Sequence, residues 1–121
     1  MAKILIVDDD VDILSVLGIL LSMKDFEVDV TPKGENTFSK IETFKPDLIL
    51  LDVLISGFDG RTICQQLKSN EQTRHIPVIM FSAHPAAAAF ITEYGANDFI
   101  AKPFNAVNLI KKVNAQLGIG G

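Results

Sequence analysis

The sequence contains no tryptophan, a single tyrosine and a single cysteine in 121 residues. A lone cysteine, Cys64, cannot form an internal disulfide, and this fits a reducing compartment. No apolar run is long enough to cross a bilayer, because the longest, Ile13–Met23, is short and contains serines. No signal peptide is visible, since Lys3 leads directly into a strand-like run. These absences lead us to expect a cytoplasmic protein with no membrane partner.

Positive charge is scarce as well. The 11 lysines and arginines are outnumbered by 15 aspartates and glutamates, so the formal net charge is −4. Binding to a nucleic-acid backbone requires clustered basic side chains, and we therefore expect no direct nucleic-acid partner. Apolar residues make up 48% and charged residues 21%, which is typical of a globular domain. We expect one domain over residues 1–121, with a glycine-rich tail at 118–121.

Short apolar or β-branched runs alternate with segments of helical spacing along the whole chain. The runs predict five strands: Ile4–Val7, Glu27–Thr31, Asp47–Leu51, Val78–Phe81 and Asp98–Ala101. Each is followed by an apolar stripe at helical spacing, the fourth of which contains Phe90, Ile91 and Tyr94. Strict alternation predicts an α/β fold, a doubly wound parallel sheet of five strands with helices on both faces.

Polar side chains follow the first, third, fourth and fifth predicted strands at their carboxyl ends. They are Asp8 and Asp9, Asp52, Ser82 and Lys102. Open parallel sheets bind ligands at this edge, so we expect these groups to lie together. Clustered carboxylates repel one another unless a cation neutralises them, and a set of oxygen donors favours a hard ion such as Mg²⁺. The sequence therefore predicts a Mg²⁺ site with a lysine beside it, placed to pair with an anion.

Four motifs occur in order at these strands: "VDDD", "LILLDV", "MFSA" and "DFIAKPF". Together, at these intervals, they resemble the receiver domain of bacterial response regulators. The resemblance extends from Ala2 to Leu117 and implies a flavodoxin-like (βα)5 fold with strand order 2-1-3-4-5. It also implies a role in two-component signal transduction, as in the chemotaxis regulators of this family.

The resemblance assigns roles to individual residues. Asp52 matches the phosphoacceptor, which takes a phosphoryl group from a histidine kinase or a histidine phosphotransfer protein in a Mg²⁺-dependent reaction. Asp9 matches a direct metal ligand that acts together with Asp52, and Asp8 matches a neighbour that holds the metal through water. The backbone carbonyl of Leu54 matches a main-chain ligand. Lys102 matches the residue that pairs with a phosphoryl oxygen.

Two further residues match the conformational switch of the family. Ser82 matches the hydroxyl residue that turns toward the phosphoryl group, and Phe99 matches the aromatic residue that rotates inward with it. Phe99 has no hydroxyl, so this switch works by packing, and simple core packing is an almost equal alternative for its role. The family also has a cis peptide bond at the position of Lys102–Pro103. Asp10 is more simply read as a helix N-cap.

The implied chemistry agrees with general principles. A carboxylate with a pKa near ~3.9 is ionised at neutral pH and needs no general base to act as a nucleophile. Phosphoryl transfer depends mainly on positioning and charge neutralisation, which a metal ion and Lys102 supply. The chain would thus assist its own phosphorylation and dephosphorylation without being an enzyme in the usual sense.

Two surfaces are expected to contact partner proteins. In the family, a kinase or phosphotransfer domain docks on the first helix. Here that helix has no charge from Ile13 to Met23, so we predict an apolar docking surface that includes Ile13, Val16 and Leu20, and an apolar helix of a monomeric protein is the alternative. In the family, the fourth helix, fifth strand and fifth helix form the output face toward a downstream protein. Here that output face contains Phe90, Tyr94, Ile100 and Lys111.

Some residues depart from the family pattern, and functions other than that of a phosphorylated receiver remain as alternatives. Ser56 stands where the family usually has proline, and Leu54 and His84 occupy positions that vary among receivers. A phosphorylation-independent receiver-like binding module is the main alternative. An aspartate-based phosphohydrolase would need a second aspartate where Leu54 stands, and an FMN carrier would need a phosphate loop where the aspartates lie. The sequence leaves open whether the receiver acts alone or as part of a longer protein.

Overall fold

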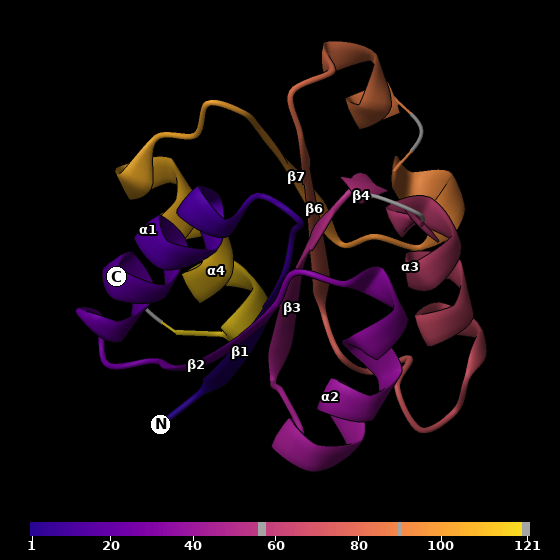
Figure 1. Cartoon of the computed structure of the whole chain (residues 1–121), viewed down its shortest axis with the longest axis horizontal. Coiled ribbons are helices and arrows are strands. Elements are labelled where there is room, and N and C mark those ends of the chain that lie inside the picture. The colour runs from indigo at the N-terminus through magenta and orange to yellow at the C-terminus, as the bar shows by residue number, and fades with distance from the viewer. Residues whose placement is uncertain (56–57, 90, 120–121) are drawn as a thin grey trace.

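The computed structural model describes residues 1–55, 58–89 and 91–119, and its centre is a five-stranded parallel sheet (Figure 1). The strands are β1 (Lys3–Val7), β2 (Glu27–Thr31), β3 (Leu48–Asp52), β6 (Val78–Ser82) and β7 (Asp98–Ala101). They lie in the order β2-β1-β3-β6-β7. This confirms the predicted α/β fold class, the five strands and their order 2-1-3-4-5.

Four α-helices of the described chain cover the sheet: α1 (Val11–Ser22), α2 (Thr37–Phe44), α3 (Gly60–Ser69) and α4 (Ala106–Leu117). Figure 1 shows α1 and α4 on one side of the sheet and α2 and α3 on the other. The two core clusters follow the alternation of side chains: Ile4 and Ile6 pack on the side of α1 and α4, whereas Leu5 and Val7 pack on the side of α2 and α3. Burial on both faces explains why these strands are apolar throughout.

Side-chain caps fix where the helices begin. Asp10 accepts hydrogen bonds from the backbone N–H groups of Asp12 at 3.0 Å and Ile13 at 3.4 Å, which confirms its predicted capping role. Asp59 caps α3 and Asn105 caps α4 in the same way. Each cap lies between a strand of the sheet and the helix that follows it. It therefore also fixes the position of the backbone near the predicted site.

The connection after β3 contains an element that was not predicted. A short antiparallel pair, β4 (Leu54–Ile55) and β5 (Phe58–Asp59), leads into α3. Ser56 and Gly57, where the sequence departs from the family pattern, lie outside the described residues. Gly60 follows at once, and a Cβ there would clash with the backbone carbonyl oxygen of Asp52. Only glycine lets the chain pass this close to the end of β3.

The segment between β6 and β7 differs from the predicted fourth helix. It forms two short 3₁₀ helices, η2 (Pro85–Ala89) and η3 (Ile91–Tyr94), in place of one α-helix. A helix gains most of its stability by packing an apolar face, and the alanines of η2 have little apolar area to bury. Ile91 is the buried residue of η3, and Phe90, expected in the same stripe, lies outside the described residues.

The first helix also exposes a different set of side chains from the predicted one. Val16 is 55% exposed, in agreement with the prediction, but Ile13 and Leu20 are half-buried and pack against the core. Ile19 and Met23 are exposed instead, at 64% and 75%. At 3.6 residues per turn, Ile13 and Leu20 flank the buried stripe of the helix, which the lack of charge alone could not show. No helix in residues 1–55, 58–89 or 91–119 is both long and apolar enough to span a membrane.

Candidate functional site

The predicted site residues meet at the carboxyl edge of the sheet. Asp8 and Lys102 follow β1 and β7 directly, and Asp52 is the last residue of β3. Side chains alternate along a strand, so all three extend on the face that α1 and α4 cover. Carboxylate oxygens of Asp8, Asp9 and Asp52 lie within 4.8 Å of one another. The fold thus brings together side chains that are 94 positions apart in the sequence, as between Asp8 and Lys102.

Lys102 forms the positive part of this cluster. Its Nζ lies 2.8 Å from Oδ2 of Asp8 and 3.4 Å from Oδ2 of Asp52, and its side chain is 16% exposed. The same ammonium lies 4.8 Å from the centre of the Phe81 ring, which adds a cation–π contact. Burial acts to lower the pKa of Lys102, but the hydrogen bond to Asp8 and the charges of both carboxylates raise it above its ordinary value. Lys102 therefore remains an ammonium at neutral pH.

The surroundings of the Asp52 carboxyl group change its pKa. Burial, and next the negative charge of Asp8, raise the pKa of Asp52 from 3.8 to about 6. Lys102 and the backbone N–H of Leu54 act in the opposite direction, by charge and by hydrogen bonding to the carboxylate. Asp52 is therefore mostly ionised at neutral pH, but it is a stronger base than an exposed aspartate.

Both carboxylate oxygens of Asp8 already accept hydrogen bonds from the protein. Oδ1 accepts from the backbone N–H of Asp10 at 2.9 Å, and Oδ2 accepts from Lys102 at 2.8 Å. The side chain is 0% exposed, so these two contacts replace hydration and fix its orientation. Asp8 thus joins the start of α1 to the cluster, because Asp10 is also the cap of that helix.

Ser82 is the last residue of β6 and lies at the same edge of the sheet. Its side chain extends on the opposite face, which α2 and α3 cover. It is 3% exposed, and its Oγ accepts a hydrogen bond from the backbone N–H of His84 at 3.0 Å. An open groove of about 390 Å³ begins here and is also lined by Leu54, His84 and Arg61. Leu54 is 53% exposed, so its side chain adds apolar surface at the mouth of the groove.

Phe99 is half-buried on β7 and packs against the core on the side of α2 and α3. It pairs in register with Met80 of β6, two residues before Ser82 on the same face. The predicted switch residues are therefore on neighbouring strands and share one face of the sheet. The Lys102–Pro103 peptide bond is cis, as the resemblance implied.

Arg61 is a residue of this region that the sequence did not reveal. Its guanidinium lies 2.7 Å from Oδ2 of Asp59 and 5.6 Å from the centre of the Tyr94 ring. The hydrogen bonds from Arg61 hold the pKa of Asp59 below its ordinary value. Residues two positions apart on a helix do not contact each other, so the spacing gave no sign of this pair. The contact forms because Asp59 is the cap of α3 and not a helical residue. The stacking on Tyr94 joins α3 to η3 across more than 30 positions, and no sequence signal indicated it.

The donor atoms of the cluster fit a hard divalent cation. Three carboxylates within 4.8 Å offer oxygen ligands only, and Lys102 is the one positive side chain shown in contact with Asp8 and Asp52 in the described part of the chain. A site of this composition suits Mg²⁺ and not a metal that prefers nitrogen or sulfur ligands.

A sheet of this order, with its polar side chains at the carboxyl edge, defines an α/β protein of the flavodoxin-like class. Residues 4–114 match the response regulator receiver domain, so the chain belongs to this family. The family consists of signal receivers of two-component systems, which are not classical enzymes. The resemblance inferred from the four motifs is confirmed.

Relatives and solved structures support this assignment. The chain is 37% identical over 116 residues to the response regulator PleD of Caulobacter vibrioides, covering 94% of the chain and 26% of PleD. It is 35% identical over 119 residues to the DNA-binding dual master transcriptional regulator RpaA of Synechocystis, covering 97% of the chain and 49% of RpaA. The crystal structure of a putative response regulator from Chloroflexus aurantiacus superposes with a TM-score of 0.91 at 33% identity, over 97% of this chain and 98% of that one. The chain thus spans half or less of the two curated relatives.

The expectation about partners needs correction. Composition led us to exclude nucleic acid, but RpaA, which matches 97% of the chain, is a DNA-binding regulator. The net charge of one domain reports only on the surface of that domain, whereas RpaA is about twice as long as the matched region. The exclusion is therefore wrong. Ile100 was also misplaced on the output face, because it is 3% exposed and packs in the core.

Proposed function

We propose that the chain is a phosphoacceptor receiver in which Asp52 accepts a phosphoryl group from a histidine kinase or a histidine phosphotransfer protein. One observation carries this proposal. In a chain of the receiver family, the oxygens of Asp8, Asp9 and Asp52 lie within 4.8 Å of one another, and Lys102 lies 3.4 Å from the proposed acceptor. The ammonium, together with a cation held by the carboxylates, is suited to neutralising the charge of an incoming phosphoryl group.

In the proposed step, an ionised oxygen of Asp52 attacks the phosphorus of a phosphohistidine. A phosphorus–oxygen bond forms, the phosphorus–nitrogen bond breaks, and the electron pair leaves with the donor imidazole. Lys102 is placed to pair with one phosphoryl oxygen, because it already lies beside Asp52. The Oγ of Ser82 accepts the His84 N–H, which leaves its own O–H to donate to another phosphoryl oxygen.

Mg²⁺ fits the carboxylate cluster, and when bound it supplies positive charge beside the transferring group. We propose that Asp9, Asp52 and the backbone carbonyl of Leu54 hold the ion directly. Asp8 has both oxygens engaged by Asp10 and Lys102, which supports a contact through water and not a direct one.

The output of the phosphorylated state is proposed to depend on Ser82 and Phe99. A hydrogen bond from Ser82 to the phosphoryl group would shift the end of β6, and the half-buried Phe99 on the adjacent strand would repack. Phosphorylation would thereby shift the population between two packed states, which bind partners differently. We also propose that the protein acts in the cytoplasm, because its lone cysteine fits a reducing compartment.

The test is the intact mass of the protein after incubation with acetyl phosphate and Mg²⁺. We expect one added phosphoryl group on the parent protein, and none when EDTA replaces Mg²⁺. Asp52→Asn should add none under any of these conditions. Asp47→Asn is the matched control, because Asp47 is an exposed carboxylate at the opposite, amino end of β3, and it should be phosphorylated like the parent.

Protein-borne phosphohistidine donors extend the same assay. A folded parent protein that gains no mass from either kind of donor would contradict the proposal and favour a phosphorylation-independent binding module. Equal labelling of the Asp52→Asn variant would show that the acceptor is another residue.

A further inference from the structure

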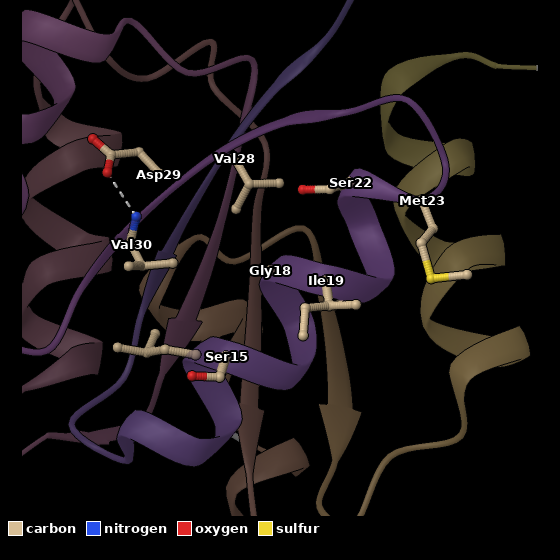
Figure 2. Close-up of a pocket in the computed structure, with 9 residues that line it drawn as sticks. Ser15, Gly18, Ile19, Ser22, Met23, Val28, Asp29 and Val30 are labelled. Carbon is tan, nitrogen blue, oxygen red and sulfur yellow. Dashed lines mark hydrogen bonds between the residues drawn. The ribbon is translucent and has the colours of Figure 1, made fainter.

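Two grooves in the described part of the chain differ in what lies beside them. The larger, of about 650 Å³, runs between α1 and the edge strand β2, and mostly apolar side chains line it (Figure 2). It contains none of the predicted site residues. The smaller, of about 390 Å³, begins at Ser82, whose hydroxyl is proposed to contact the phosphoryl group, and is called the Ser82 groove below. The shape of the Ser82 groove therefore bears on the chemistry at Asp52.

The Ser82 groove has two walls, which come from different parts of the chain. The first wall is the connection from β3 into α3 and includes Leu54 and Arg61. The second wall is the end of β6 together with η2, and it includes Ser82, His84 and Ala87. Because the walls are separate segments, the width of the groove depends on how firmly the second wall is held against the first.

Hydrogen bonds do not tie the second wall to the rest of the fold. In residues 83–89 and 91–96 of the described chain, every hydrogen bond goes to a group within residues 82–96. Ile91 and Ala87 pack against the core, whereas the other described alanines of η2 are exposed. The segment between β6 and β7 therefore depends on a small number of side-chain contacts for its position.

Arg61 supplies one of these contacts from the first wall. Its guanidinium carbon lies 5.6 Å from the centre of the Tyr94 ring in η3, which is within the range of a cation–π contact. Asp59 orients the guanidinium, because its carboxylate accepts hydrogen bonds from Nε at 2.9 Å and from Nη2 at 2.7 Å. Arg61 also follows Gly60, at which the backbone passes close to the carbonyl oxygen of Asp52. Arg61 thus connects a fixed part of the backbone at the end of β3 with η3.

We propose that Arg61 is a positioning residue that sets the width of the Ser82 groove through its contact with Tyr94 and so limits the access of water to phosphorylated Asp52. This inference rests on the proposed phosphoryl transfer. In hydrolysis, a water oxygen bonds to phosphorus and the bond from phosphorus to the Asp52 oxygen breaks. Inorganic phosphate leaves, the carboxylate is restored, and one proton of the water passes to solvent. A wider groove admits water more readily, so loss of the contact shortens the lifetime of the phosphorylated state.

Hydrogen exchange of the unphosphorylated protein, followed by mass spectrometry, tests the contact itself. We expect Tyr94→Leu and Arg61→Gln each to speed exchange in residues 83–89 and 91–94 by about two- to fivefold, the range that one exposed cation–π contact allows. The double variant should exchange no faster than either single variant, because each already removes the whole contact. Tyr94→Leu leaves the pair of Arg61 and Asp59 intact, so its effect is separate from any effect of that pair.

The lifetime of the phosphorylated state tests the consequence for the site. Protein labelled with acetyl phosphate is freed of the donor, and intact mass follows the loss of the phosphoryl group in Mg²⁺. We expect Tyr94→Leu and Arg61→Gln to lose it about two- to fivefold faster than the parent. Tyr94→Phe keeps the aromatic ring and should restore the parent lifetime. Arg74→Gln is the matched control, because it removes the same charge from an exposed side chain, and its lifetime should equal that of the parent.

Equal exchange in the parent and in Tyr94→Leu would overturn the proposal. Faster exchange with an unchanged lifetime would also overturn it, since the contact would then not act on the site. A parent that gains no phosphoryl group would instead contradict the proposed function, and this inference would fail with it. Far-UV circular dichroism checks that each variant is folded.

Discussion

At Asp52, the ionised carboxylate that the proposed phosphoryl transfer requires lowers the stability of the folded, metal-free protein. Burial and the charge of Asp8 raise its pKa from 3.8 to about 6, so the folded protein binds a proton more tightly there than the unfolded chain does. Between these two pKa values the folded state holds more protons, and the free energy of unfolding falls as the pH rises through this window. Above about pH 6 this contribution is fully lost, and the ionised carboxylate destabilises the metal-free protein.

We therefore expect Asp52→Asn to stabilise the metal-free protein at pH 7. A shift of about two pKa units corresponds to about 3 kcal/mol, and this is the upper limit of the expected gain. The gain should shrink as the pH is lowered from 7 to about 5, because the parent then becomes protonated at Asp52. Urea unfolding in EDTA, followed by far-UV circular dichroism, measures it without the need for tryptophan.

The control for this variant is Glu71→Gln, which removes the same charge from an exposed side chain. Because this variant keeps Asp52, its free energy of unfolding should match that of the parent both at pH 5 and at pH 7. An Asp52→Asn variant no more stable than the parent at pH 7 would contradict the raised pKa of Asp52.

At the scale of single elements, two threonines at helix ends have opposite surroundings. Thr37 begins α2 and is fully buried, and its Oγ1 is the one buried side-chain polar atom of the described residues that lacks a hydrogen-bond partner. Thr73 follows α3, and its Oγ1 donates a hydrogen bond of 2.7 Å to the carbonyl oxygen of Leu67 in that helix. The Thr37 hydroxyl thus loses its hydration without gaining a hydrogen bond, whereas the Thr73 hydroxyl satisfies a carbonyl group near the C-terminal end of α3.

Replacing each threonine with valine keeps the shape and removes only the hydroxyl. We expect Thr37→Val to stabilise the protein by about 1 kcal/mol and Thr73→Val to destabilise it by about 1 kcal/mol. The two variants are controls for each other, because both make the same chemical change next to a helix. Thermal unfolding would show the opposite signs, and a loss of stability in Thr37→Val would mean that its hydroxyl does have a partner in solution.

At the scale of the whole molecule, Cys64 reports on opening of the fold. Its side chain is 0% exposed on α3, and burial raises the pKa of the thiol to about 11. Reaction with an alkylating reagent requires the exposed thiolate, so the folded protein is protected both by access and by protonation.

We expect iodoacetamide at pH 8 to label Cys64 in the folded protein far more slowly than in urea, at a rate set by opening of the core. Intact mass measures the labelled fraction, and the protein in urea is the control for the reactivity of the exposed thiol. Labelling at similar rates in both would mean that α3 leaves the sheet readily, which contradicts the buried packing described here.

The sequence by itself determined the elements that depend on local pattern. Alternation of apolar runs with helical stripes predicted the parallel sheet, and Asp10 was identified as a cap because capping needs only a side chain next to its own helix. It also placed Asp8, Asp52 and Lys102 at one edge, since parallel strands end on the same side. The exclusion of nucleic acid failed because composition describes one domain and not its context in relatives such as RpaA.

Only the tertiary structure decided how these groups meet. The distance of 2.8 Å between Lys102 and Asp8 and the raised pKa of Asp52 depend on strand register and burial, which no local pattern encodes. The two 3₁₀ helices between β6 and β7 and the outward position of Ile19 likewise follow from which side chains find space in the core. Periodicity fixes which face a side chain takes, but packing between distant segments fixes what that side chain contacts and how far water is excluded from it.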